Sequence, residues 1–301
     1  MYKFEVPENK KFRVIVDTDA KNEADDQYAI AHALMTPKFD IKGIIATHFG
    51  ALRSPHSMQD SYDECVKVID LMGYSDKVKL LKSAINAVKS ETEYEYSEGA
   101  ALIVEEALTD DPTPLFVVFL GPITNLACAY LKHPEIAGKL TAIWIGGDIY
   151  PSGGREYNLS NDINAANIIM KSNIELWQVP RNVYTMMRTS HAELQERVYP
   201  CGELGKYLFD QLVEFNMKFS VQNPERDWPR GESWSLGDNP VIGLMMDPHE
   251  YDFTMREAPT IDEQMMYHFD GKGRQIRVYH NIDHRFILED LFYKLKMNYG
   301  S

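Results

Sequence analysis

One strand-to-helix turn near the N-terminus constrains this chain more than any other feature. A β-branched apolar run at residues 14–16 is typical of a buried strand, and it leads into Asp17 and Asp19. Side chains spaced i, i+2 point to the same side of a strand. A short polar loop then reaches Asp25 and Asp26, where the apolar spacing of a helix begins. Four carboxylates therefore crowd a single turn.

Four like charges this close repel one another unless they take up protons or bind a cation. Carboxylates without nearby Cys or His favour a hard divalent ion, calcium or magnesium, over zinc. In the alternative interpretation, Asp25 and Asp26 are solvated residues favoured by the helix dipole, and Asp17 or Asp19 lies near the N-cap. Since that alternative explains only one or two of the four acids, we favour a metal site.

Strands and helices alternate through the first 180 residues or so. Apolar runs predict further strands at residues 39–47, 78–81, 115–120, 140–145 and 174–179. Helical spacing predicts helices at residues 59–72, 99–108 and 125–132, and another that starts at Asn161 or Asp162. This pattern indicates an α/β fold with a mostly parallel, doubly wound sheet and helices on both faces.

Polar turns follow several of the predicted strands, at residues 17–26, His48, 121–125 and 147–158. In parallel sheets, ligands bind outside the carboxyl ends of the strands. We therefore expect these turns to share one edge of the sheet.

The last third of the chain is less regular. We expect a single domain over residues 1–301, with a helical and loop-rich segment at about 190–265. Within it, residues 192–221 are predicted to be helical, and the Pro- and Trp-rich loop 222–235 is a candidate lid. A strand at 274–279 and a helix up to residue 295 should close the chain.

Composition limits the partners of the protein. A formal charge of −14 argues against binding to nucleic acids or anionic membranes, which require a basic surface. Three widely spaced cysteines fit a reducing compartment better than a disulfide scaffold. With no legible signal peptide and no apolar run of about 18 residues, we expect a soluble, cytoplasmic protein that binds a small molecule.

The motifs together resemble the nucleoside hydrolase family. The resemblance rests on the acidic turn at 17–26, on Gly-Pro-Ile-Thr-Asn-Leu-Ala at 121–127, on Gly146-Gly147 followed by Glu156-Tyr157-Asn158, and on Asp238 before an apolar helix. It implies the family's α/β fold and a calcium ion. The implied ligands are Asp19, Asp26, Asp238 and the backbone carbonyl of Leu120.

The resemblance also implies an activity, the hydrolysis of a ribonucleoside or nucleoside-like compound to ribose and free base, as in purine and pyrimidine salvage. Asp25 would activate a metal-bound water, and Asp17, Glu156 and Asn158 would hold the sugar. From the residues alone, a solvated loop is the favoured interpretation of Glu156 and Asn158. The family further implies a homodimer or homotetramer.

The chain departs from the family pattern on the sides of the site that face the sugar and the base. Residues 20–24 make a longer loop than usual, and the segment 147–156 is shorter. Gly237 stands where the family often has His, which excludes protonation of the leaving group by that His. Trp234 or Trp228 is then a candidate for stacking on the base, and His48 is a weaker one.

Two other functions remain open at this point. An Asp-x-Asp phosphatase would use Asp17 as nucleophile and Asp19 as acid and base with magnesium, but a clear downstream Lys is lacking and Asp25 and Asp26 have no role in it. A protein that binds ribose or a cation without turnover is the second alternative, since the family's His is missing.

Overall fold

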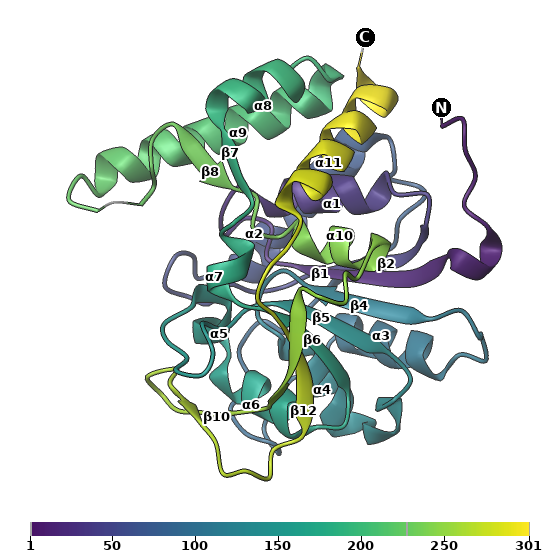
Figure 1. The fold of residues 1–301 in the computed structure, drawn as a ribbon, viewed down its shortest axis with the longest axis vertical. Helices are drawn as coiled ribbons and strands as arrows, with labels where there is room; N and C mark the ends of the chain where they lie inside the picture. Colours follow the sequence, from purple (N-terminus) through teal and green to yellow (C-terminus); the bar gives the residue numbers. More distant parts are fainter. Residues whose placement is uncertain (1, 227, 301) are drawn as a thin grey trace.

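The computed structural model describes residues 2–226 and 228–300, and in this part of the chain eight strands form the main sheet (Figure 1). Their order is β3-β2-β1-β4-β5-β6-β12-β9, and the neighbours pair in parallel except for β9, which is antiparallel to β12. The strands are β1 (Phe12–Thr18), β2 (Phe39–Ala46), β3 (Leu80–Lys82), β4 (Leu115–Phe119), β5 (Thr141–Ile145), β6 (Glu175–Val179), β9 (Phe253–Glu257) and β12 (Gln275–Tyr279). The predicted mostly parallel sheet is confirmed.

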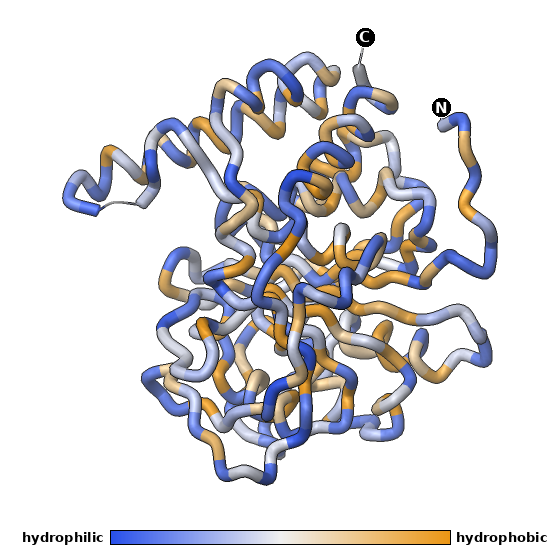
Figure 2. The backbone as a smooth tube through the Cα atoms, in the orientation of Figure 1, coloured by the Kyte–Doolittle hydropathy of each residue, from blue (hydrophilic) through white to orange (hydrophobic). Residues whose placement is uncertain are grey.

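Apolar side chains on both faces of the sheet explain why its strands are rich in Val and Ile. In β1, Val14 and Val16 pack into one hydrophobic core, and Ile15 packs into the other. The most hydrophobic parts of the chain accordingly run through the centre of the molecule (Figure 2).

Helices cover both faces, as predicted, with α1, α10 and α11 above the sheet and α3, α4 and α6 below it in the view of Figure 1. The first face is covered by α1 (Asp26–Leu34), α2 (Ser57–Met72), α7 (Arg181–Tyr184), α8 (His191–Arg197), α9 (Gly202–Gln222), α10 (Pro240–Met246) and α11 (His284–Tyr299). The second face is covered by α3 (Glu98–Leu108), α4 (Thr124–Lys132) and α6 (Ile163–Lys171).

The remaining elements are short. They are the helices α5 (Tyr157–Asn161), η1 (Glu8–Lys10) and η2 (Pro134–Ile136), and two antiparallel pairs, β7 (Arg188–Ser190) with β8 (Ser233–Ser235) and β10 (Thr260–Ile261) with β11 (Tyr267–His268).

The C-terminus of α2 and the N-terminus of α6 lie at the capping residues that the sequence predicts. Gly73 follows α2 with φ +70°, a left-handed conformation that Gly adopts without a Cβ penalty. Asp162 is the N-cap of α6, and its side chain accepts a hydrogen bond from the Ala165 N–H.

The prediction of continuous helix over residues 192–221 is wrong. The segment holds two helices, α8 and α9, and the chain between them contains Pro200. Proline lacks the N–H that an α-helix needs and disfavours helical geometry at the residue before it. The apolar positions of α9 nevertheless face the core, since Leu204, Leu208 and Leu212 are buried.

The order of the strands produces a switch point between β1 and β4. From β1 the chain proceeds outward to β2 and β3, whereas β4, β5 and β6 follow one another on the other side of β1. Loops that leave adjacent strands at such a point diverge to opposite faces and leave a crevice at the carboxyl edge.

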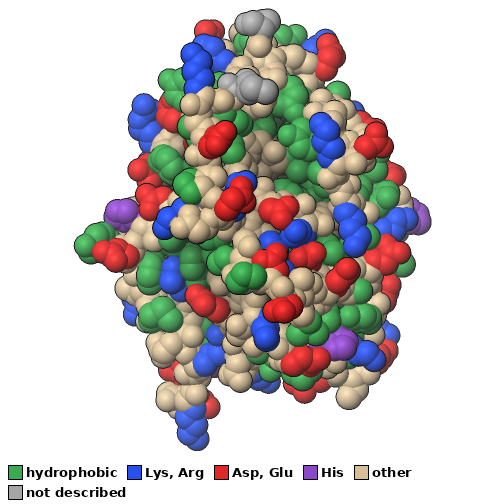
Figure 3. All heavy atoms as spheres, turned by 90° about the vertical axis from the view of Figure 1, so that its right-hand side faces the viewer, with side chains coloured by type: hydrophobic (Ala, Val, Ile, Leu, Met, Phe, Trp, Pro, Cys, Tyr) green, Lys and Arg blue, Asp and Glu red, His purple; other side chains and the backbone are tan. Residues whose placement is uncertain are grey.

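Two observations bear on the expected partners. Among the described residues, no helix is long and apolar enough to cross a bilayer. On the face drawn in Figure 3, acidic and basic side chains are interspersed.

Candidate functional site

A small cavity lies at the switch point, beyond the carboxyl ends of β1, β4 and β5, and its volume is about 50 Å³. It is lined by Asp19, Asn22, Glu23, Asp25, Asp26, Leu120, Ile145, Glu156, Tyr157, Asn158, Tyr184, Gly237 and Asp238. Residues from the first strand-to-helix turn thus meet Asp238 in space. The structure brings together Asp19, Asp25, Asp26, Leu120, Glu156, Asn158 and Asp238 from the predicted set.

The N-terminus of α1 presents two of the carboxylates. Asp25 is the N-cap residue and Asp26 the first helical residue. Asp26 accepts a hydrogen bond from the Thr18 hydroxyl, and Asp25 Oδ2 accepts one from the Gly237 N–H at 2.9 Å. Both acids are buried, with exposed fractions of 8% and 1%, so the alternative that they are solvated residues of the first turn is wrong.

The carboxylates repel one another strongly at this position. One oxygen each from Asp25, Asp26 and Asp238 lies within 4.8 Å of the other two. Burial raises the pKa of Asp25 and of Asp238, and so do their acidic neighbours. Burial also raises the pKa of Asp26 to about 7. Such a group of carboxylates is costly unless protons or a cation neutralise it.

The donor atoms fit a hard divalent cation. Asp19 Oδ2 is buried and has no hydrogen-bond partner among the described residues. The cluster offers oxygen atoms alone, which calcium and magnesium prefer. The backbone oxygen of Leu120 adds a carbonyl ligand of the kind that calcium sites often contain.

The side chain of Asn158 joins the ends of two strands beside this cluster. Its Nδ2 donates to the carbonyl of Leu120 at 2.7 Å and to the carbonyl of Ile145 at 2.9 Å. A carbonyl oxygen has two lone pairs, so Leu120 keeps one for a second partner. The amide of Asn158 therefore fixes the direction in which that carbonyl points.

Glu156 is held by four donors. Its Oε2 accepts from the backbone N–H groups of Gly147 and Leu159, and its Oε1 accepts from the N–H of Asn158 and the hydroxyl of Tyr184. Burial is the largest cause of its raised pKa. Both Glu156 and Asn158 are buried, so the alternative of a solvated loop at these positions is wrong.

Asp17 does not line the cavity. It belongs to β1, which ends at Thr18, and its Oδ2 accepts a hydrogen bond from Asn125 Nδ2 of α4 at 2.7 Å. Asp19 comes after the last strand residue, so the alternation of the strand does not determine where its side chain points. Only the second acid of the pair thus reaches the cavity.

His48 and Trp234 also lie outside the cavity lining, in contrast to the expectation that they contact the base. His48 Nε2 lies 3.0 Å from the Thr124 hydroxyl, and burial lowers the pKa of the imidazole to about 4. Trp234 belongs to β8 and packs edge-on against Phe215 of α9 with ring centroids 5.5 Å apart. His48 is thus engaged in a polar contact with α4, and Trp234 in packing against α9.

The aromatic loop before β8 packs on α9 in the same way. Trp228 lies 5.4 Å from Trp234 and 5.8 Å from Phe219 between ring centroids. Asp227, which belongs to the candidate lid, lies outside the described residues.

Several lining residues were missed in the sequence. Asn22 and Glu23 belong to the long loop, and Arg53 lies behind them, with its Nη1 donating to the Asn22 carbonyl at 2.8 Å and its Nη2 3.6 Å from Glu23. The Arg53 guanidinium also lies 4.3 Å from the centre of the Tyr157 ring. Tyr184, which follows the end of β6, could have been found by the rule that polar side chains after parallel strands share one edge.

Comparison with known proteins identifies the family of the chain. Residues 14–289 match the family described as inosine-uridine preferring nucleoside hydrolase. The chain belongs to this family.

Curated nucleoside hydrolases are similar to the chain at low identity. Uridine nucleosidase 1 of Arabidopsis thaliana is 26% identical over 71% of this chain and 69% of its own length. Pyrimidine-specific ribonucleoside hydrolase RihA of Citrobacter koseri is 25% identical over 68% of this chain and 71% of its own. The chain is therefore a divergent nucleoside hydrolase, a glycosidase of the N-ribosyl type.

Solved structures share the fold. The purine-preferring ribonucleoside hydrolase from Gardnerella vaginalis aligns with a TM-score of 0.73 at 20% identity and covers 95% of this chain and 98% of its own. The plant nucleoside hydrolase PpNRh1 also aligns with a TM-score of 0.73, at 18% identity, and covers 94% of this chain and 98% of its own. The fold of this hydrolase is thus that of its family over nearly the whole chain.

Gly237, where the nucleoside hydrolase pattern often has His, is explained by close packing. A Cβ at this position would lie 3.0 Å from Cδ2 of Tyr184 and 3.4 Å from Oδ2 of Asp25. Contacts of 3.0 Å are too short for carbon atoms unless one of them moves. Tyr184 therefore occupies space that a side chain at position 237 would need.

Proposed function

We propose that this nucleoside hydrolase uses calcium to hydrolyse the N-glycosidic bond of a ribonucleoside, or of a nucleoside-like compound, to ribose and free base. The observation that supports this most is the meeting of Asp19, Asp25, Asp26 and Asp238 in one cavity beside the Leu120 carbonyl. These residues come from three segments that lie far apart in the sequence.

In this proposal Asp19, Asp26, Asp238 and the carbonyl of Leu120 hold the ion. When bound, the ion neutralises the buried acids and lowers the pKa of a coordinated water. Asn158 orients the Leu120 carbonyl, and Thr18 fixes Asp26 through its hydroxyl.

Asp25 is the proposed general base. Its Oδ2 is held by the Gly237 N–H, which leaves Oδ1 to accept a proton from water. Cleavage of a glycosidic bond passes through an oxocarbenium-like state, and nearby negative charge stabilises that state. Asn158 lies beside the acids, where its side-chain oxygen can accept from a ribose hydroxyl, and Glu156 would exchange one of its four donors to hold the sugar. Asp17 lies outside the cavity and holds Asn125.

Substrate entry requires side chains that line the cavity to move. A cavity of about 50 Å³ is far smaller than the 300–1,000 Å³ of ordinary small-molecule sites. Tyr157 and Glu23 line this cavity, and Arg53 is stacked on the first and close to the second. We assign these three side chains to the wall that opens.

A panel of nucleosides tests the proposal. Purified protein with calcium should release free base from at least one of inosine, uridine, adenosine and guanosine. EDTA and, separately, Asp25→Ala should abolish that release. If no nucleoside in a broad panel is turned over with calcium present, the hydrolase proposal fails, and stabilisation by ribose alone would then favour a protein that only binds the sugar.

The phosphatase alternative has little support. It requires Asp17 as an accessible nucleophile, but this side chain is fully buried and lies outside the cavity lining. By analogy with its family we also propose a homodimer or homotetramer, which light scattering of the purified protein would test.

A further inference from the structure

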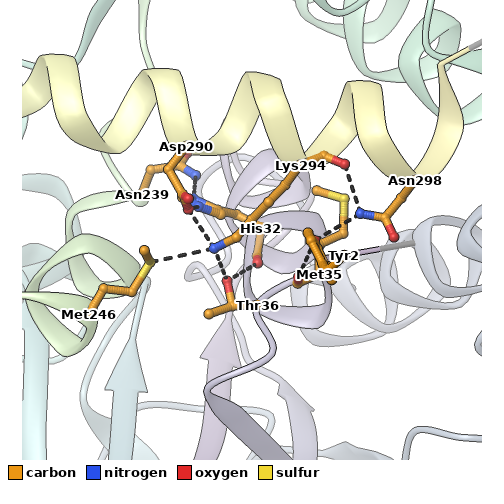
Figure 4. Close-up of polar contacts among 9 residues, drawn as sticks. All are labelled: Tyr2, His32, Met35, Thr36, Asn239, Met246, Asp290, Lys294 and Asn298. Carbon is orange, nitrogen blue, oxygen red and sulfur yellow. Dashed lines mark hydrogen bonds and ion pairs between the residues drawn. The ribbon is translucent and has the colours of Figure 1, made fainter. Parts of the chain in front are cut away.

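A buried polar network joins α1, α10 with its N-cap residue Asn239, and α11 (Figure 4). His32 of α1 is fully buried and has a partner on each side of its ring. Asn239 Nδ2 lies 3.1 Å from His32 Nδ1, and Asp290 Oδ2 lies 2.7 Å from His32 Nε2. Burial lowers the pKa of His32 to about 4, so a neutral ring accepts from Asn239 and donates to Asp290.

The far end of the network is equally paired. Lys294 of α11 is 3% exposed, and its Nζ lies 2.5 Å from Asp290 Oδ2 and 2.9 Å from the Thr36 hydroxyl. Thr36 in turn donates to the His32 carbonyl at 2.7 Å. Buried polar groups such as these destabilise a protein unless they are paired.

The network reaches the cavity through the backbone next to Asp238. Asn239 follows Asp238 directly, and its side chain is bonded to His32 of α1. Gly237 precedes Asp238, and its N–H is bonded to Asp25 at the N-terminus of the same helix. Asp238 is thus flanked on both sides by hydrogen bonds to the helix that begins with Asp26.

Among the described residues, the contact with His32 is the hydrogen bond that holds the side chain of Asn239. This side chain is fully buried, and its Oδ1 has no hydrogen-bond partner among the described residues. Removing the imidazole would therefore leave the amide of Asn239 free to turn. The ring itself is held by Asp290 and, through that residue, by Lys294.

We propose that Asn239 and His32 are positioning residues that set the carboxylate of Asp238 against that of Asp26, an inference that rests on the metal site of the proposed function. Neither side chain lines the cavity. Their effect is on the spacing of two oxygen ligands from different parts of the chain. Groups that orient metal ligands in this indirect way typically change metal affinity by 10- to 100-fold.

The affinity of the protein for calcium tests this without turnover. Calcium should be titrated calorimetrically into EDTA-stripped wild-type protein and into Asn239→Ala, which leaves the Asp290 and Lys294 pair in place. We expect the Kd to rise by about tenfold or more. His32→Phe should raise the Kd for calcium by a similar factor. The double variant should have the same Kd as either single variant, because both changes break the same contact between Asn239 and His32.

A matched control separates positioning from loss of stability. Tyr28 lies on the same helix, is buried, and donates its hydroxyl to the Leu208 carbonyl of α9 at 2.9 Å. Tyr28→Phe therefore removes one buried hydrogen bond of α1 without touching Asn239. We expect it to lower the Tm and to leave the Kd for calcium unchanged.

Two results would overturn the positioning role of Asn239 and His32 and leave the proposed metal site intact. One is a wild-type Kd retained within twofold in folded Asn239→Ala, and the other is an equal loss of affinity in Tyr28→Phe. A wild-type protein that binds no calcium would instead refute the proposed metal site, and the positioning role with it.

Discussion

Asp25 and Asp238 line the same cavity but are held differently. Asp25 receives a backbone hydrogen bond from Gly237, whereas Asp238 lies beside Asp25 and Asp26, and burial and the acids around it raise its pKa. In the proposed mechanism the first accepts a proton and the second binds the ion. Removing the charge of each should therefore have different consequences.

Asp25→Asn should lower turnover by roughly 10²- to 10⁴-fold, because the amide cannot accept the proton of water, and it should still bind calcium. Asp238→Asn should lose calcium binding as well as turnover. The measurements are base release and calorimetric titration, with exposed Asp63→Asn as the control. Loss of calcium binding in Asp25→Asn would show that this residue is a metal ligand.

The buried histidines predict a dependence of stability on pH. His48 has a pKa of about 4 in the folded protein against 6.5 for an ordinary His, so the unfolded chain binds its proton first as the pH falls. The contribution of His48 to the free energy of unfolding should be largest above pH 6.5 and decrease as the pH falls to about 4. His48→Gln should reduce this decrease by roughly 2–3 kcal/mol.

Urea unfolding of both proteins at pH 7 and pH 4.5 measures the effect. The difference between them cancels the titration of the acids that they share. An equal loss of stability in wild type and His48→Gln would contradict the burial of a neutral imidazole.

Short elements after the strands position the site, and α5 shows how. This five-residue helix starts at the N-cap Glu156, whose carboxylate accepts from the N–H groups of Asn158 and Leu159. The same carboxylate reaches Gly147 and Tyr184 on neighbouring loops. One side chain therefore holds together the segments that follow β5 and β6.

Glu156→Gln should lower the free energy of unfolding by about 1–3 kcal/mol. Each oxygen of Glu156 accepts from two donors, so the amide group of Gln would face two donors whichever way it turned. Thermal or chemical unfolding measures the loss, with the exposed Glu91→Gln as control. Equal stability of the two variants would refute the capping role.

For the molecule as a whole, the metal site of the proposed function would couple metal binding to folding. Buried carboxylates of like charge destabilise the metal-free fold, and an ion that binds only the folded state stabilises it by mass action. The two strand-to-helix turns that supply these acids lie far apart in the sequence, so the cluster exists only in the folded chain.

Calcium at 100 times its Kd should raise the free energy of unfolding by about 2.7 kcal/mol. The Tm of wild-type protein should therefore rise with calcium, and that of Asp238→Asn should not. A scanning calorimeter records both, with EDTA as the reference condition. An equal rise of the Tm with calcium in wild type and Asp238→Asn would show that Asp238 is not a ligand of the ion.

Much of the architecture was predictable because its signals are local. Apolar runs such as residues 115–120, the Gly73 end of α2 and the Asp162 cap of α6 depend on neighbouring residues alone. Where a local signal was overlooked, as at Pro200, one long helix was predicted in place of two. The site was partly predictable because polar turns after parallel strands share one edge.

The sequence by itself determined most strands of the main sheet, several of the helices that cover it, the carboxyl edge on which the acids lie and the family to which the chain belongs. Tertiary structure alone decided that Asp17 lies outside the cavity, that Trp234 packs on α9, and that Glu23 lines the site. These outcomes depend on where β1 ends and on contacts between residues far apart in the chain. Local propensity and spacing carry no information about such contacts, because they arise only when the elements pack.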